Sequence, residues 1–339
     1  MDGSEARSGL LEMIGGYRAT ALVTTAARLG LADLLAEGPA GLGRLAELTG
    51  ARPDRLLQLL RALVAVGLLE PRPDGAFALT PLGEPLRTDL PDSLHSAAVY
   101  FGAVSAPSFD SLYDLLHTDG DGFRSRHGTD FYGFLGTHPE LAAHYNAVIA
   151  VEGLGDALAE AYDFGAAASV ADIGGGNGTT LAELLLAHPH LTGTLQEIPH
   201  VMEEARDRLA DPGLAGRATA VPGSFLDGVV PGADLYLLVR VLPNWGDEEA
   251  LRILRHFAAV MTPGARLLIV DAEMPEQVAA GAFAPIGDLH ALVHFGGRLR
   301  SRSELAGLLS AAGLRFSGAA SVPVPGRPQW SLSEVEVDR

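Results

Sequence analysis

The 339-residue sequence contains neither cysteine nor lysine. The absence of cysteine excludes disulfides, thiol nucleophiles, iron–sulfur clusters and cysteine-bound zinc. The absence of lysine excludes a Schiff-base mechanism and the lysine of a phosphate-binding P-loop. Proton chemistry therefore falls to the 11 histidines, the carboxylates, the tyrosines and the hydroxyl side chains.

The chain is also poor in positive charge and in long apolar runs. It has 24 basic residues, all of them arginine, against 42 acidic residues, and a formal net charge of -18. A surface with this charge repels phosphate backbones, so we expect no nucleic-acid partner. The polar amino terminus lacks the pattern of a signal peptide, and no apolar run approaches the roughly 18 residues that cross a bilayer. These features predict a globular, cytoplasmic protein that does not associate with membranes.

Residues 1–90 are predicted to form a helical domain that ends in a pair of strands. Apolar residues recur at helical spacing in four stretches before the strands. Three helices followed by two strands are typical of a winged helix, and the acidic composition favours dimerisation over DNA binding. Apolar residues near the amino terminus (Leu10, Leu11, Ile14 and Tyr17) predict a two-fold homodimer. The expected helices are Tyr17–Leu29, Leu31–Leu35, Gly43–Thr49 and Pro53–Val66, and the expected strands are Leu68–Glu70 and Ala76–Leu79.

Residues 91–165 are predicted to be a helical linker that covers the substrate. The density of aromatic residues in this region indicates that some rings line a cavity for an apolar or aromatic ligand. The segment Thr118–Arg126 is rich in Gly and Asp and is predicted to be an exposed loop. The aromatic residues are Tyr100, Phe101, Phe109, Tyr113, Phe123, Phe131, Tyr132, Phe134 and Tyr145.

Residues 166–339 alternate between short apolar runs and stretches with helical periodicity. This alternation predicts an α/β domain, a Rossmann-like doubly wound sheet of mostly parallel strands with helices on both faces. The last two runs, Arg315–Val322 and Trp330–Val335, are predicted to close the sheet as a hairpin.

A glycine-rich segment between a predicted strand and a predicted helix is the strongest local signal. It runs Val-Ala-Asp-Ile-Gly-Gly-Gly-Asn-Gly from Val170 to Gly178. Glycines at this place let backbone amides approach a ligand at a helix amino terminus. Thr179 stands where a dinucleotide fingerprint requires Gly or Ala, which disfavours a pyrophosphate. Glu197 ends the next strand, about 20 residues on, where an acid binds a ribose diol. The pattern predicts an adenosine-containing ligand without a pyrophosphate.

Six segments in this order resemble the S-adenosylmethionine-dependent small-molecule O-methyltransferases of plants and bacterial natural-product pathways. They are Asp172–Gly178, Glu197–Val201, Gly223–Asp227, Val241–Trp245, Met261–Gly264 and Phe295–Arg298. The resemblance covers nearly the whole chain and implies a homodimer with S-adenosyl-L-methionine as cofactor. It implies that the glycine loop holds the methionine end and that Glu197 holds the ribose hydroxyls. The cofactor-binding residues it implies are Asp172, Gly174, Gly176, Glu197, Ser224, Phe225 and Arg240.

Four positions depart from the family pattern. Pro243 stands where typical members have their general base, a histidine, and Leu299 where they have a glutamate that orients it. Asp271 stands where they have a second glutamate, and Ser224 replaces the aspartate that commonly contacts adenine. This combination resembles the anthracycline-tailoring subgroup, which includes a methyltransferase and a cofactor-dependent hydroxylase.

Three functions remain open on this pattern. Positioning and desolvation are sufficient for methyl transfer to an acidic phenol, so we favour a methyltransferase acting on a hydroxyl of an aromatic or polyketide intermediate. The alternatives are a repurposed cofactor-dependent enzyme (hydroxylase, decarboxylase or cyclase) that does not transfer the methyl group, and a binding role without catalysis. The residues predicted to act in catalysis are His294, Asn244 and Asp271.

Two histidines, His290 and His294, lie four residues apart in a predicted helix, which puts both rings on one face. Such a pair can bind a metal, but no third ligand is obvious beyond Asp288 or Asp271, so we expect polar pocket groups and no metal. His294 is the better substitute proton acceptor, because the Phe295–Gly297 segment follows it directly. The predicted substrate-binding residues are Tyr145, Asn146, Ile149, His290, His294, Asn244 and Arg298.

Overall fold

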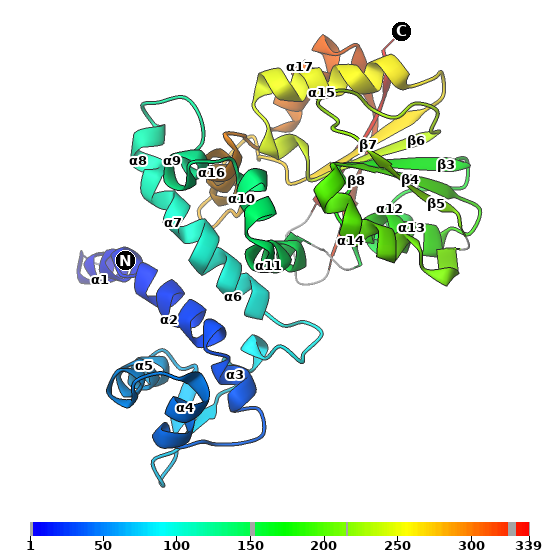
Figure 1. Ribbon diagram of the computed structural model, residues 1–339. Helices are drawn as coiled ribbons and strands as arrows, with labels where there is room; N and C mark the ends of the chain where they lie inside the picture. Colours follow the sequence, from blue (N-terminus) through cyan, green and yellow to red (C-terminus); the bar gives the residue numbers. More distant parts are fainter. Residues whose placement is uncertain (1–2, 150–152, 215, 325–329, 339) are drawn as a thin grey trace. The chain divides into compact units, whose positions relative to one another are not determined.

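The computed structural model describes residues 3–149, 153–214, 216–324 and 330–338. The chain divides into two compact units (Figure 1). The first comprises Met1–Phe109 and His138–Ile149, and the second comprises Asp110–Thr137 and Ala150–Arg339. Among the described residues, no helix is both long enough and apolar enough to cross a bilayer.

The first unit consists of helices and one small antiparallel sheet. Its core contains apolar side chains from the central helices, such as Leu45, Leu60 and Leu63, each at most 1% exposed. The predicted helices and strands between residues 17 and 79 agree with the structure to within one residue at each end. The elements are α1 (Gly3–Ile14), α2 (Tyr17–Arg28), α3 (Leu31–Leu34), α4 (Leu42–Thr49), α5 (Pro53–Ala65), β1 (Leu69–Pro71), β2 (Phe77–Leu79), η1 (Glu84–Leu86), α6 (His95–Tyr100), η2 (Phe101–Ser105), α7 (Ala106–Ser108) and α11 (Pro139–Ile149).

The second unit is built on a seven-stranded sheet. Its strand order is β5-β4-β3-β6-β7-β9-β8; the pairs from β5 to β7 are parallel, and β9 pairs antiparallel with both β7 and β8. The predicted closing hairpin is confirmed by the pairing of β8 with β9. The strands are β3 (Ser169–Ile173), β4 (Thr192–Glu197), β5 (Ala218–Pro222), β6 (Leu235–Val239), β7 (Arg266–Asp271), β8 (Leu314–Val322) and β9 (Trp330–Val337).

Helices cover both faces of this sheet (Figure 1). α12, α13 and α14 contribute to the core on one face, and α15 and α17 to the core on the other. The central strands are buried on both faces, which explains their nearly continuous apolar sequences. The predicted doubly wound α/β fold is confirmed. The helices are η3 (Phe109–Ser111), α8 (Leu112–Leu115), α9 (Gly122–His127), α10 (Phe131–Thr137), α12 (Leu154–Ala161), α13 (Thr179–Ala187), α14 (Pro199–Leu209), η4 (Pro212–Leu214), η5 (Leu242–Asn244), α15 (Asp247–Val260), α16 (Ala284–Phe295) and α17 (Arg302–Ala311).

The strand order places a topological switch at the middle of the sheet. From β3 the chain moves outward through β4 and β5, and it then returns to add β6 and β7 on the other side of β3. Ligands of open α/β sheets bind outside the carboxyl ends of the strands at such a point. The site is therefore expected at the carboxyl ends of β3, β4 and β6.

One predicted loop is partly a helix. The expected exposed loop over Thr118–Arg126 is wrong for its second half, where α9 begins at Gly122. The Asp121 carboxylate accepts a hydrogen bond from the Arg124 backbone amide (2.6 Å) and so caps the helix. Phe123 then lies fully buried. The Asp that suggested a loop by composition is in fact a helix cap.

Candidate active site

The glycine loop turns sharply at the end of β3. Gly174 and Gly176 adopt positive φ angles of 71° and 61°, which favour glycine. A Cβ atom at Gly174 would lie 2.9 Å from Phe225 Cε1, so the ring packs directly on the loop. At Gly176 a Cβ atom would meet nothing within 4 Å. The loop therefore has one face packed on Phe225 and one face open at Gly176.

The Glu197 carboxylate lies beside this open face, at the carboxyl end of β4. Its Oε2 accepts a hydrogen bond from the Gly176 amide (3.1 Å), and its Oε1 accepts one from the Ile198 amide (2.7 Å). A carboxylate has about four lone-pair positions and can also accept hydrogen bonds from a diol. An open glycine turn next to a fixed carboxylate suits the ribose and methionine portions of S-adenosylmethionine.

Asp172 lies beneath the loop and not on its open face. Its side chain is fully buried, and within the described part of the chain neither carboxylate oxygen has a hydrogen-bond partner. A Cβ atom at Gly175 would lie 2.1 Å from Asp172 Oδ2, so the loop backbone closes over the carboxyl. Burial, with a smaller contribution from the Glu197 charge, raises the pKa of Asp172 to about 7. The predicted role of Asp172 in cofactor binding would therefore be indirect, through the backbone of the glycine loop.

Gln196 ties a second loop to the first, and sequence reasoning missed it. Its side chain is 4% exposed, donates from Nε2 to the Gly228 carbonyl (2.7 Å) and accepts at Oε1 from the Val230 amide (2.8 Å). Its backbone carbonyl accepts from the Gly174 amide (2.9 Å). The loop it holds carries Ser224, whose hydroxyl accepts from the Leu226 amide (3.2 Å). The signal in the sequence that could have indicated this residue is a glutamine near the end of a predicted strand, where a buried side chain is usually apolar.

Arg240 follows β6 in an unusual backbone conformation. It has a φ of 59°, the one positive value among the described non-glycine residues. Its guanidinium lies 5.1 Å from the centroid of the Trp330 ring, and its amide donates to the Val270 carbonyl (2.9 Å). Its charge favours the ionised form of Asp271, against a larger opposite effect of burial, and adds to the effect of burial that lowers the pKa of His290. Its predicted contact with the cofactor stays a prediction.

The segment after Arg240 carries Pro243 and Asn244 in η5. Asn244 Nδ2 donates to Tyr132 Oη (3.0 Å), and the Tyr132 ring stacks on Phe295 with centroids 5.9 Å apart. Gly297 packs against the segment so closely that a Cβ atom there would lie 2.1 Å from the Pro243 carbonyl oxygen. Tyr132 was expected only as part of an aromatic cluster. The structure puts a neutral amide–phenol pair at this place.

His290 and His294 stack face to face on α16. Their ring centroids are 3.9 Å apart, and His294 Nδ1 lies 3.0 Å from the His290 carbonyl oxygen. The rings of Phe123 and Phe131 each lie 5.9 Å from the His294 ring. Burial lowers the pKa of His290 to about 3 and that of His294 to about 4. Both imidazoles are therefore neutral at pH 6–8. In the described ranges, no three His, Asp or Glu side chains are grouped to hold a metal ion.

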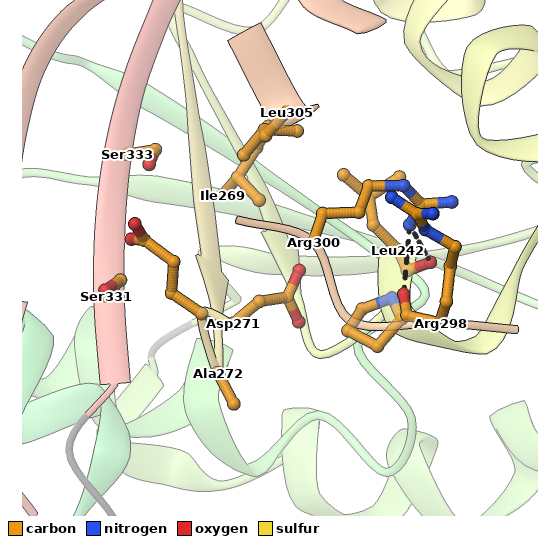
Figure 2. A pocket seen from close by; sticks show the side chains of 11 residues that line it. Leu242, Ile269, Asp271, Ala272, Arg298, Arg300, Leu305, Ser331 and Ser333 are labelled. Carbon is orange, nitrogen blue, oxygen red and sulfur yellow. Dashed lines mark hydrogen bonds between the residues drawn. The ribbon is translucent and has the colours of Figure 1, made fainter. Parts of the chain in front are cut away.

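Asp271 ends β7 at the edge of a small pocket (Figure 2). Its Oδ1 is buried and has no hydrogen-bond partner within the described residues, and burial raises its pKa well above the usual value. Arg298 and Arg300 line the same pocket. Arg298 forms ion pairs with Glu304 and, at 3.6 Å, with Asp247. A contact of Arg298 with the substrate, as predicted, would therefore compete with its ion pairs to these two carboxylates.

The three remaining predicted substrate residues lie in the first unit, on α11. Tyr145 packs its ring 5.4 Å from that of Tyr100, and Asn146 and Ile149 follow on the same helix. The second unit thus brings together His290, His294 and Phe295, and the Tyr132 ring, stacked on Phe295, connects this group to Asn244. The roles of the α11 residues stay predictions.

The fold and this arrangement define an S-adenosylmethionine-dependent methyltransferase. An O-methyltransferase domain model matches residues 109–315, and an O-methyltransferase dimerisation domain model matches residues 11–89. The chain belongs to the O-methyltransferase family, and S-adenosyl-L-methionine is its cofactor.

Individual relatives agree with this assignment. O-demethylpuromycin-O-methyltransferase of Streptomyces alboniger is 36% identical over 97% of this chain and 89% of its own length. Aclacinomycin 10-hydroxylase RdmB of Streptomyces purpurascens is 38% identical over 93% and 87%. A solved structure of the O-methyltransferase NcsB1 from neocarzinostatin biosynthesis, in complex with S-adenosylmethionine and 2-hydroxy-5-methyl naphthoic acid, has a TM-score of 0.79, 33% identity, and covers 94% of this chain and 96% of that chain. The predicted resemblance, including its anthracycline subgroup, is confirmed.

Proposed function

We propose that this chain methylates a hydroxyl of an aromatic or polyketide natural-product intermediate by positioning and desolvation, without a general base. The observation that carries the proposal is the neutral pair at η5, where Asn244 Nδ2 donates to Tyr132 Oη. Pro243, at the position of the family's histidine, has no proton to exchange. Neither Asn244 nor a neutral phenol takes up a proton readily near pH 7.

The cofactor, when bound, supplies an electrophilic methyl group on a sulfonium. The chain's own groups then have three tasks. The glycine loop and Glu197 hold the cofactor by its ribose and methionine portions. Asn244 and Tyr132 orient the acceptor oxygen, and the aromatic rings around α16 exclude water. Orientation and desolvation of this kind can supply several kcal/mol of rate enhancement.

The acceptor proposed for this site is an acidic phenol, for instance one conjugated to a quinone. Such a phenol loses its proton to solvent near neutral pH, so no residue needs to remove it. Relatives named for puromycin, mitomycin and naphthoate acceptors support an aromatic substrate. The neutral state of His290 and His294 suits a largely apolar aromatic ring system.

A second candidate is a tailoring reaction in which the methyl group stays on the cofactor. The relative named aclacinomycin 10-hydroxylase, at 38% identity, supports it. An assay with methyl-labelled S-adenosylmethionine against a panel of hydroxylated polycyclic aromatics separates the two. Methyl transfer predicts label in the product and an equal amount of S-adenosylhomocysteine. Product without label, with the cofactor recovered intact, would establish the second candidate instead.

We also propose that the chain is a homodimer through its amino-terminal helices. The dimerisation domain match includes part of α1, which has no buried residue. The side chains of Met13 in α1 and of Tyr17 just after it are 80% and 72% exposed. An obligate apolar interface above about 2,000 Å² would cover such side chains. Light scattering should give twice the chain mass of 35.3 kDa, and a value near 35.3 kDa at micromolar concentration would refute the dimer.

A further inference from the structure

The Arg300 side chain is buried beside the segment that carries Asn244. It is 4% exposed and makes hydrogen bonds with all of its nitrogens. Nη1 donates to the Leu242 carbonyl (3.0 Å), and Nη2 donates to the Trp245 carbonyl (2.8 Å). Figure 2 shows the first of these bonds at the pocket wall.

These two carbonyls flank Pro243 and Asn244 in the chain. One planar guanidinium therefore fixes both ends of the four-residue segment with its two terminal nitrogens. Arg300 Nη1 also donates to the Arg298 carbonyl (3.3 Å), which ties the segment to the stretch after α16. Gly297 in that stretch packs closely on the Pro243 carbonyl.

The charge of Arg300 is balanced where it lies. Asp247, at the start of α15, accepts from Arg300 Nε (3.0 Å) and lies 2.9 Å from Nη2. A buried guanidinium with a carboxylate partner and carbonyl acceptors has its desolvation offset, whereas removal of one partner leaves the others unsatisfied. An ammonium group cannot reproduce this planar set of donors.

We propose that Arg300 is a positioning residue for the acceptor: it holds the 242–245 segment so that Asn244 meets the acceptor oxygen. The proposal rests on the proposed function, since it assigns Asn244 to the acceptor. In a chain that lacks the histidine at position 243 and the glutamate at position 299, the order of this segment comes from Arg300. Its loss should lower turnover and leave cofactor binding intact.

The test compares Arg300→Ala and Arg300→Lys with Arg252→Ala, a change at an exposed arginine on α15 that pairs only with Asp227 among its described contacts. Acceptor turnover is measured together with cofactor affinity by calorimetry. We expect kcat/KM to fall by about 10- to 100-fold in both Arg300 variants, with cofactor Kd changed less than about 2-fold. The Arg252 variant should match wild type. Millimolar guanidinium should restore part of the Arg300→Ala activity and none of the Arg300→Lys loss.

A second readout does not depend on methyl transfer. The chain has two tryptophans, so Trp330→Phe leaves Trp245 as the sole tryptophan, within the segment that Arg300 holds. In this background Arg300→Lys should increase quenching of Trp245 by acrylamide while the protein remains folded by circular dichroism. Unchanged quenching, or full turnover in the Arg300 variants, would overturn the proposal. Increased quenching in a protein that methylates no acceptor would instead refute the proposed function and retain the role of Arg300 in ordering the segment.

Discussion

The second unit has a cofactor end, formed by the glycine loop and Glu197, and an acceptor end, formed by the 242–245 segment with Tyr132, Gly297 and Arg300. The two ends belong to the same α/β unit but differ in the chemistry of their contacts. At the cofactor end, the glycine turns and the acid Glu197 match the family pattern, and Ser224 departs from it. At the acceptor end, Pro243 and Leu299 stand where the family resemblance implies two titratable groups, Asn244 pairs with the Tyr132 phenol, and Arg300 donates to backbone carbonyls. Under the proposed function, cofactor binding is retained while the means of handling the acceptor has changed.

The two ends also differ in what a substitution should disturb. A change at Glu197 removes a group that would touch the ligand directly. A change at Gly297 or Arg300 moves backbone, and its effect reaches the acceptor through Asn244. The cofactor end should therefore respond in Kd, and the acceptor end in turnover.

The largest effect is expected for Glu197→Ala. The substitution removes the carboxylate that accepts from the Gly176 amide and is proposed to hold the ribose. A hydrogen bond to a charged group contributes about 1.5–3 kcal/mol, which corresponds to a cofactor Kd about 10- to 150-fold weaker. Calorimetry measures this, with Glu197→Gln as the matched control of intermediate affinity. Equal affinity of the alanine variant and the wild type would remove Glu197 from the cofactor site.

Gly297→Ala tests the acceptor end by a purely steric change. The added methyl would lie 2.1 Å from the Pro243 carbonyl oxygen and 2.5 Å from the Asn244 carbonyl carbon, so the segment must move. A displacement of about 1 Å near the reacting atoms can cost up to about 100-fold in rate. We expect kcat to fall by about that factor while cofactor Kd stays within about 2-fold. Gly307→Ala on α17, where a Cβ meets nothing within 4 Å, is the control.

Asn244→Ala should have a smaller effect on turnover. It removes the hydrogen bond to Tyr132 and leaves the backbone in place. Loss of orientation alone is expected to lower kcat by about 10-fold, or about 1.4 kcal/mol, whereas loss of a general base costs about 10²–10⁴-fold. Steady-state kinetics with a methylated product as the readout decides between these ranges.

The smallest effect on turnover is expected for Asp172→Asn, which tests burial beneath the glycine loop. The folded-state pKa of Asp172, about 7, lies above the usual value. The contribution of this protonated carboxyl to the stability of the fold is therefore present at low pH and is lost as pH rises toward 7. The neutral variant should therefore unfold at a Tm several degrees higher than the wild type at pH 8 and at about the same Tm at pH 4.5. A lower Tm at pH 8 would show that the carboxylate is stabilised by a contact with its charge.

Most of the fold was predictable, because the alternation of strands and helices and the apolar spacing of α2–α5 depend on local sequence. The open turn at Gly176 beside Glu197 was predictable for the same reason, since a strand, a glycine loop and the next strand end place both groups at one sheet edge. The α9 helix was not predictable, because its cap, Asp121, lies in a segment whose Gly- and Asp-rich composition is typical of a loop.

The contacts at the acceptor end could not be read from the sequence. Asn244 and Tyr132 are more than a hundred residues apart and meet only through tertiary packing. Arg298 was the predicted substrate residue of its segment, but it is held by Glu304 and Asp247, whereas Arg300 faces the 242–245 segment. Both arginines lie near Asp247, and it is Arg300 that also donates to the Leu242 and Trp245 carbonyls. Only the tertiary packing decides which of the two reaches the segment.

The central claim, catalysis without a titrating base, is tested most directly by His294→Ala in single-turnover methyl transfer between pH 4.5 and pH 8. The pKa of His294, lowered by burial to about 4, keeps the ring neutral over nearly all of this range, so a flat profile at pH 6–8 alone would not identify the base. Our account predicts that the variant loses less than about 10-fold in rate at every pH and that its profile has the shape of the wild-type profile. A loss of about 10²–10⁴-fold, together with disappearance of an acidic limb that the wild type shows near pH 4–5, would make His294 the general base and contradict the account.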